Sequence, residues 1–198
     1  MHRAPSSDVR VSSQASVSTN QAIGDPRAIR LALSILGSFE FGDNLSVQFI
    51  NATVVGHLDD ENPLTRVGAA LCCCKVLSCI HSLDSASKEA RNEILERCLV
   101  LAAADPESDV RKSILEAMNG DFDSFLAEDS NLRLVLVPLN DEDLEVRKIA
   151  TTLLGRLGRK NPSYIMPTFR KTLVQLLTGK HCSTARLTLH FQVRRPNR

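Results

Sequence analysis

Three consecutive cysteines, Cys72, Cys73 and Cys74, are the residues most suggestive of metal or thiol chemistry. Thiolates hold zinc when several ligands converge on one point. Consecutive side chains on a helix point about 100° apart, so these three cannot share one ion. No CxxC pair is present, and the other cysteines stand alone in the sequence: Cys79, Cys98 and Cys182. We therefore expect reduced thiols that pack as small apolar groups, with no metal site and no cofactor. A small metal or redox protein built on the three consecutive cysteines is an alternative.

Other patterns of catalytic residues are weak or absent in this sequence. It contains no GxxxxGK[ST] phosphate-binding loop, and its histidines form no HExxH motif. Asp121-Phe122-Asp123 is similar to the DFG triplet of kinases, but the glycine is missing and no kinase catalytic loop precedes it. We expect no catalytic residue and no small-molecule substrate in this chain.

Acidic residues followed by an arginine recur along the chain. The pairs are Asp25 and Arg30, Asp60 and Arg66, Asp105 and Arg111, and Asp141 and Arg147. The arginines stand 36, 45 and 36 positions apart (30 to 66, 66 to 111, 111 to 147). Apolar residues at helical spacing follow each pair, most regularly in residues 141–157. A helical motif at this interval is typical of HEAT or armadillo repeats, whose period is about 40–47 residues.

The repeated arginines have a packing role in such an array. A guanidinium can hydrogen-bond a carboxylate or a carbonyl in an adjacent turn, and so link successive repeats. We predict that Arg66, Arg111 and Arg147 form a structural ladder with three aspartates: Asp60, Asp105 and Asp141. The alternative is that each pair is a solvated helix start worth under about 1 kcal/mol.

The hydrophobic spacing predicts an all-α solenoid of stacked antiparallel helix pairs of the HEAT or armadillo type. Three full repeats pair helices 45–57 with 63–80, 86–103 with 107–118, and 122–137 with 143–157. Helices 26–36 and 162–178 are half repeats at the two ends, and helix 122–137 should break near Asp129-Ser130. We expect Asp25 and Ser85 to cap helices, and Gly120 to end one in a left-handed conformation. In helix 45–57 we expect four residues to face the core: Leu45, Phe49, Ala52 and Val55.

Composition excludes several classes of partner. The chain is 43% hydrophobic and 24% charged, with a formal net charge of +1, so no global field favours nucleic acid or an anionic membrane. One group of basic residues most resembles a solvated face: Arg156, Arg159, Lys160, Arg170 and Lys171. No apolar run approaches the roughly 20 residues that span a bilayer, and we expect a cytoplasmic protein.

Three segments are predicted. Residues 1–22 are rich in serine and should be disordered; a mitochondrial presequence is a weaker interpretation. Residues 23–178 should form the solenoid, and residues 179–198 an irregular basic tail.

Several motifs in residues 122–177 resemble the N-terminal HEAT region of the target of rapamycin (TOR) kinases. They are Phe122-Asp123, Leu126-Ala127, Asn131-Leu132, Leu139-Asn140-Asp141, Glu145-Val146-Arg147, Gly155-Arg156-Leu157, Asn161-Pro162, Met166-Pro167 and Arg170-Lys171. Residues 30–33 and 36–39 resemble the same region, so the resemblance covers about residues 26–178. After Gly179 the pattern departs from the family, which continues into a further helical repeat.

The resemblance implies a non-catalytic scaffold segment of a TOR-type kinase. The FAT, rapamycin-binding and kinase regions are not found in this sequence, so no catalytic residue carries over. The implied partners are proteins, namely a Raptor-type subunit and a second TOR protomer. An unrelated HEAT-repeat adaptor, such as a phosphatase scaffold or a transport receptor, is the alternative.

Overall fold

The computed structural model describes residues 25–39, 42–80 and 82–177, and every regular element in these residues is a helix. The α-helices are α2 (Pro26–Leu36), α3 (Asp43–Thr53), α4 (Pro63–Ser78), α5 (Ser85–Ala104), α6 (Ser108–Ala117), α7 (Asp123–Leu126), α8 (Asp129–Leu136), α9 (Leu144–Leu157) and α10 (Pro162–Leu177). Three 3₁₀ helices connect some of them: η1 (Val55–Asp59), η2 (Gly120–Phe122) and η3 (Val137–Asn140). The sequence-based segments 1–22 and 179–198 lie outside the described residues.

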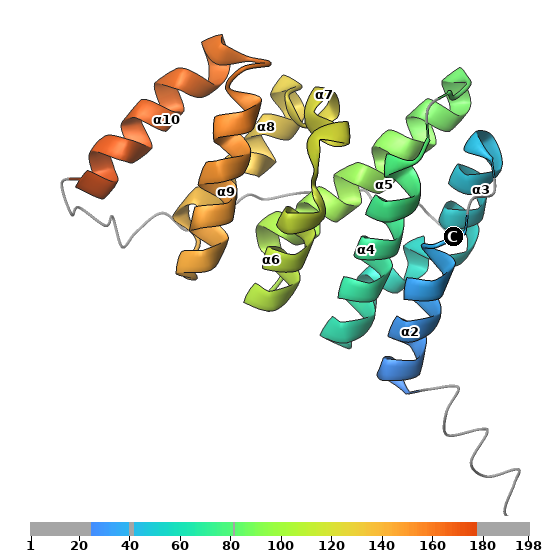
Figure 1. Cartoon of the computed structure of the whole chain (residues 1–198). Helices are drawn as coiled ribbons and strands as arrows, with labels where there is room; N and C mark the ends of the chain where they lie inside the picture. The colour runs from blue at the N-terminus through green and yellow to red at the C-terminus, as the bar shows by residue number, and fades with distance from the viewer. Residues whose placement is uncertain (1–24, 40–41, 81, 178–198) are drawn as a thin grey trace, which may run out of the picture.

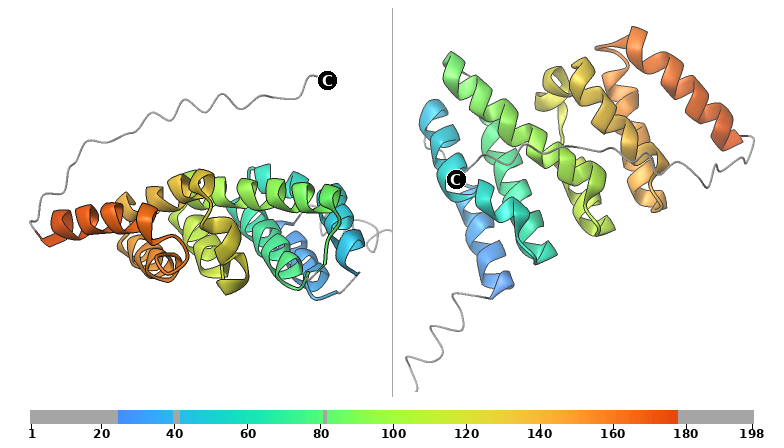
Figure 2. Two further views of the ribbon diagram at one scale, coloured as in Figure 1. Left: turned by 90° about the horizontal axis from the view of Figure 1, so that it is seen from above. Right: turned by 180° about the vertical axis from the view of Figure 1, so that it is seen from behind.

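The helices stack in two layers (Figures 1 and 2). Helices α2, α4, α6 and α9 lie side by side in one layer, and α3, α5 and α8 form the other. Helix α10 packs against α9 at the end of the array. This arrangement confirms the predicted α-solenoid. No helix in the described ranges is long and apolar enough to span a bilayer.

Polar side chains fix the helix starts. Asp25, Asn62 and Asp143 each accept a hydrogen bond from a backbone N–H of the first turn, at 2.9, 2.9 and 2.7 Å, which satisfies a donor that the helix itself cannot pair. The predicted cap at Ser85 is wrong. Asp84 caps α5 instead, because its carboxylate accepts the N–H of Ser87 at 2.7 Å and Ser85 is already helical.

One apolar stripe of each helix faces the space between the layers. In α9 the buried residues are Val146, Ala150, Leu153, Leu154 and Leu157. Helix α4 is buried on most of its surface because α2, α3, α5, α6 and η1 all pack around it. Gly68 permits the close approach of α2, because a Cβ at this position would lie 3.3 Å from Cα of Arg30.

The predicted inward face of the second helix is partly wrong. Leu45 is 64% exposed and Ala52 is also exposed. The helix begins at Asp43, and its buried apolar positions are Val47 and Ile50, followed by Val54 after its end. Both sets are compatible with a helical period, and the sequence alone did not distinguish their phases.

Two breaks also differ from the prediction. Gly120 does not adopt a left-handed conformation; it begins η2, and α6 ends at Ala117 with Met118 as its C-cap. The break in the segment 122–137 falls at Ala127 and Glu128, slightly earlier than predicted. Pro167 lies inside α10, which continues past it to Leu177.

The packing of α9 generates a stability prediction. Leu154 is fully buried, so Leu154→Ala should lower the free energy of unfolding by about 2–5 kcal/mol through lost apolar burial and a residual cavity. Leu144→Ala is the matched control, because Leu144 is 54% exposed on the same helix and should cost less than about 0.5 kcal/mol. Denaturant unfolding measures both values, and equal losses would contradict the packing of α9.

Candidate functional site

The six residues predicted to form a ladder lie at equivalent places in successive repeats. Arg66, Arg111 and Arg147 are each the fourth residue of a helix (α4, α6 and α9), and these three helices share one layer. Asp60, Asp105 and Asp141 lie in the turns that precede the same helices. We call these six residues the arginine–aspartate ladder.

Arg66 contacts two different turns. Its Nη1 donates to the backbone carbonyls of Asp60 at 2.9 Å and Glu61 at 3.0 Å, which belong to the turn before its own helix. Its Nε and Nη2 donate to the two carboxylate oxygens of Asp105, both at 2.8 Å. Asp105 precedes the next helix of the layer, so one guanidinium joins two consecutive repeats. The two side chains exclude most solvent, with residue exposures of 8% for Arg66 and 5% for Asp105.

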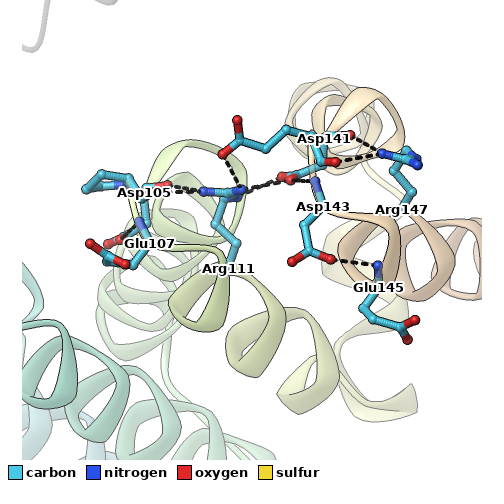
Figure 3. Close-up of polar contacts among 9 residues, drawn as sticks. Asp105, Glu107, Arg111, Asp141, Asp143, Glu145 and Arg147 are labelled. Carbon is cyan, nitrogen blue, oxygen red and sulfur yellow. Dashed lines mark hydrogen bonds and ion pairs between the residues drawn. The ribbon is translucent and has the colours of Figure 1, made fainter. Parts of the chain in front are cut away.

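Arg111 repeats this geometry one unit further along (Figure 3). Its Nη1 donates to the carbonyls of Asp105 at 2.6 Å and Pro106 at 3.2 Å. Its Nε and Nη2 donate to the carboxylate of Asp141, both at 2.7 Å. Asp105 therefore receives Arg66 on its carboxylate and Arg111 on its carbonyl.

Each aspartate also closes its own turn. One carboxylate oxygen accepts the backbone N–H two residues later: Asn62 for Asp60 at 2.8 Å, Glu107 for Asp105 at 3.0 Å, and Asp143 for Asp141 at 2.9 Å. Because an Asx turn of this kind fixes the carboxylate, the aspartate presents both oxygens in a defined direction. An arginine fork can then bind it through two parallel hydrogen bonds.

The two ends of the ladder are incomplete within the described residues. Arg147 Nη1 donates to the carbonyls of Asp141 at 2.7 Å and Glu142 at 3.0 Å, as the other two arginines do in their own turns. No carboxylate in the described part of the chain reaches its Nε or Nη2. At the other end, no described arginine reaches the Asp60 carboxylate, and Arg30 is exposed. The structure therefore joins Arg66 with Asp105 and Arg111 with Asp141, whereas each arginine meets the aspartate of its own repeat only through the carbonyl.

The electrostatics of the ladder oppose proton transfer. The hydrogen bond to Asp105 raises the pKa of Arg66 above its ordinary value, although burial acts in the opposite direction. The hydrogen bond to Asp141 raises the pKa of Arg111 in the same way. Both guanidinium groups therefore stay protonated at any physiological pH, so neither has the pKa of a general acid or base.

A second link between repeats was not recognised from the sequence. Arg156 of α9 donates from Nε to Asp123 at 2.7 Å, and from Nη2 to the carbonyls of Met118 at 2.6 Å and Asn119 at 3.1 Å. The sequence analysis placed Arg156 on a solvated basic face. The signal was present in the family motifs Phe122-Asp123 and Gly155-Arg156-Leu157, which supply the two partners.

Four of the cysteines lie in the core, three of them on α4 and Cys98 on α5, whereas Cys79 is exposed. Cys72, Cys73 and Cys74 are all buried, because α4 is surrounded by other helices. Cys98 is isolated in the sequence but not in space, because its thiol interacts with those of Cys73 and Cys74. Burial raises the pKa of the Cys72 thiol to about 11, and the interaction with Cys98 together with burial raises that of Cys74. Within the described ranges, no group of three or more His, Cys, Asp or Glu residues could hold a metal ion.

Comparison with known proteins finds TOR kinases among the relatives of this chain. No protein-family model matches the chain. The chain is 40% identical over 166 residues to the serine/threonine-protein kinase TOR of Arabidopsis thaliana, an alignment covering 76% of the chain. It is 35% identical over 159 residues to the kinase tor1 of Schizosaccharomyces pombe and 30% identical over 161 residues to mTor of Drosophila melanogaster, covering 79% and 78% of the chain. The chain is homologous to one segment of the TOR serine/threonine-protein kinases.

The matched segment is a small part of these TOR kinases. The alignments cover 7% of the plant and yeast proteins and 6% of the fly protein. Several motifs that carry the resemblance to TOR have structural contacts in this chain. Asn161, for example, donates from Nδ2 to the carbonyl of Ala127 at 3.1 Å, and Asn131 donates to the carbonyl of Phe125 at 2.8 Å.

The ladder generates a prediction about single charges. Asp105→Asn should destabilise the protein by roughly 3 kcal/mol, because it leaves the buried Arg66 guanidinium without its carboxylate. Asp60→Asn is the control: it alters the same position of the preceding turn, which binds no described arginine through its carboxylate, and should cost under about 1 kcal/mol. Urea unfolding compares the two variants. Similar losses would mean that the carboxylate of Asp105 contributes only through its turn.

The thiols generate a second prediction. Iodoacetamide at neutral pH should alkylate the exposed Cys79 in the native protein and spare the buried Cys72, Cys73, Cys74 and Cys98. A Cys182→Ser background removes the cysteine that lies outside the described residues. Peptide mass mapping before and after unfolding measures the pattern. Rapid native alkylation of Cys98, or stoichiometric zinc in protein purified without chelator, would favour the metal or redox alternative.

Proposed function

We propose that this chain is a non-catalytic HEAT-type scaffold segment of a TOR-type serine/threonine kinase, which presents helical surfaces to protein partners in TOR complexes in the cytoplasm. The single observation that carries the proposal is a contact that occurs twice: an arginine guanidinium binds carbonyls of the turn before its own helix and the aspartate carboxylate in the turn of the next repeat. That contact holds successive repeats at a fixed spacing. It occurs in a chain whose relatives are TOR kinases.

The use of the charged groups supports a non-catalytic role. The charged residues that are buried as a whole in the described ranges are held by fixed hydrogen bonds: Arg66 by Asp105, Arg111 by Asp141, and Asp123 by Arg156. A catalytic group needs a pKa near the working pH and access to a substrate. The ladder arginines have neither property. We therefore assign the kinase activity of the whole polypeptide to other regions, and no cofactor or small-molecule substrate to this chain.

The proposed partners are proteins of the TOR complex. A stack of helices exposes long ridges on both layers, and such surfaces bind other proteins in solenoids generally. By family resemblance we propose a Raptor-type subunit and a second TOR protomer. An unrelated HEAT adaptor remains the rival, and the 30–40% identity to TOR kinases of plant, yeast and fly favours the TOR assignment.

A chimaera tests this proposal. In Arabidopsis TOR the segment aligned with this chain is replaced by residues 26–177, and the purified kinase is assayed for peptide phosphorylation and for co-purification of its Raptor-type subunit. We expect the chimaera to retain both within about twofold of the parent. The matched control carries an unrelated solenoid segment with the same number of helices, and should retain peptide phosphorylation but lose the subunit.

Two results would contradict the proposal. If the chimaera and the unrelated solenoid retain the subunit equally, the segment is only a spacer. If the chimaera folds but loses the subunit as the control does, this chain is an adaptor outside TOR complexes.

A further inference from the structure

Successive helix pairs of this chain meet at three junctions. The first junction joins α2 and α3 to α4 and α5, the middle junction joins α4 and α5 to α6, α7 and α8, and the last junction joins α6, α7 and α8 to α9 and α10. The arginine–aspartate ladder lies at the N-terminal ends of α4, α6 and α9, on one side of the array, which we call the ladder end (Figure 1). The C-terminal ends of the same layer of helices lie on the other side, which we call the opposite end.

Polar contacts tie the opposite end of the first and last junctions. In the first junction, Lys75 Nζ donates to Ser38 Oγ at 2.9 Å. The backbone N–H of Ser82, which follows α4, donates to the carboxylate of Asp43 at the start of α3, at 2.8 Å. In the last junction, Arg156 of α9 holds the turn after α6 through three hydrogen bonds. Each of these two junctions therefore has a tie that is distant from the ladder.

The middle junction has no such tie within the described residues. The fork of Arg66 on Asp105 is the one side-chain hydrogen bond or ion pair that crosses it in this part of the chain, and it lies at the ladder end. At the opposite end the guanidinium of Arg91 lies over the ring of Phe122, 5.9 Å from the centroid. The buried Nε of Arg91 has no hydrogen-bond partner in the described residues. A contact between a cation and a ring fixes geometry less strictly than a charge-assisted hydrogen bond.

The sequence explains why the middle junction differs. Lys75 stands nine positions after Arg66, and Arg156 stands nine positions after Arg147; these are the residues that reach back to the preceding helix pair. The position nine after Arg111 is Gly120, which has no side chain. Helix α6 has also ended at Ala117, whereas α4 and α9 continue past the equivalent position. The residue that ties both neighbouring junctions is therefore missing from the middle one.

We propose that the helical array bends at the middle junction. The fork of Arg66 on Asp105 is the pivot, and the C-terminal ends of α4 and α6 move apart and together. Apolar packing is not directional, so a junction that is tied at one end can rotate about that tie, whereas its neighbours are tied at a distance from the ladder. Helices α2 to α5 and helices α6 to α10 then move as two bodies. The bend sets the angle between the surfaces of the two bodies whatever they bind, so the inference does not rest on the proposed function.

Spin-label distances measured by electron paramagnetic resonance in the full chain test this proposal. All variants carry Cys182→Ser, and the cysteines buried in the core stay unlabelled. Three pairs of exposed positions are compared, the last two in a Cys79→Ser background. They are Cys79 with Glu116→Cys at the opposite end of the middle junction, Glu116→Cys with Arg159→Cys at the opposite end of the last junction, and Glu61→Cys with Asp109→Cys at the ladder end of the middle junction.

We expect the distance distribution of the first pair to be about twice as broad as those of the other two pairs, because only the first pair spans an untied end. Arg156→Met removes the tie of the last junction and should broaden the second pair to the width of the first. Lys160→Met is the matched control, because Lys160 is exposed and its side chain makes no hydrogen bond within the described residues, and it should leave the second pair unchanged.

Three outcomes would overturn the proposal. Equal widths for the first and second pairs would mean that the middle junction is no more mobile than the last. Equal widths for the first and third pairs would mean that the fork of Arg66 is not a pivot. A folded Arg156→Met variant whose second pair stays narrow would mean that ties of this kind do not restrain a junction. The first two comparisons do not need that variant, and none of the three depends on the chimaera.

Discussion

The dual use of one guanidinium is the interaction on which the rest of the structure depends. A single helix pair cannot hide its apolar stripe, so the repeats must stack at a fixed spacing and rotation. Apolar packing between Leu, Ile, Val and Ala side chains supplies most of the free energy, but it is not directional. The Arg66 and Arg111 forks add direction, because each binds two carbonyls of one turn and a carboxylate of the next. Removing these charges from solvent costs free energy, and the hydrogen bonds of each fork to two carbonyls and one carboxylate offset that cost in the complete links.

The sequence predicted the fold well because its signals are local. Helical spacing of apolar residues identified nearly all helices, and the interval between arginines identified the stack. Four details of the structure were not predicted from the sequence. The buried face of α3 was mispredicted because two different sets of its apolar residues both recur at helical spacing. The thiol contact of Cys98 and the bridge from Arg156 to Asp123 join residues 24 to 33 positions apart in sequence, which spacing on one helix does not reveal. The capping residue of α5 was misplaced by one position because Asp84 and Ser85 both suit that role.

The sequence also did not reveal which repeat supplies the carboxylate for each link of the ladder. Asp and Arg six residues apart in one repeat look like a pair, yet the carboxylates that bind Arg66 and Arg111 both belong to the following repeat. A helix start brings the side chain of its fourth residue over its own preceding turn, where only carbonyls face it. The carboxylate of that turn points away, because it closes an Asx turn and faces the preceding repeat. Because of this offset the same contact can be repeated from unit to unit. Within the described residues it leaves the Asp60 carboxylate without an arginine at one end and Arg147 without a carboxylate at the other.

A pair of double-mutant cycles tests most directly the claim that these forks join repeats. One cycle combines Arg66→Met with Asp105→Asn, and the other combines Arg66→Met with Asp60→Asn, with the free energy of unfolding measured for each variant. The account predicts a coupling of about 1.5 kcal/mol or more between Arg66 and Asp105, and additivity within about 0.5 kcal/mol between Arg66 and Asp60. Additivity in the first cycle, or equal coupling in both, would contradict it.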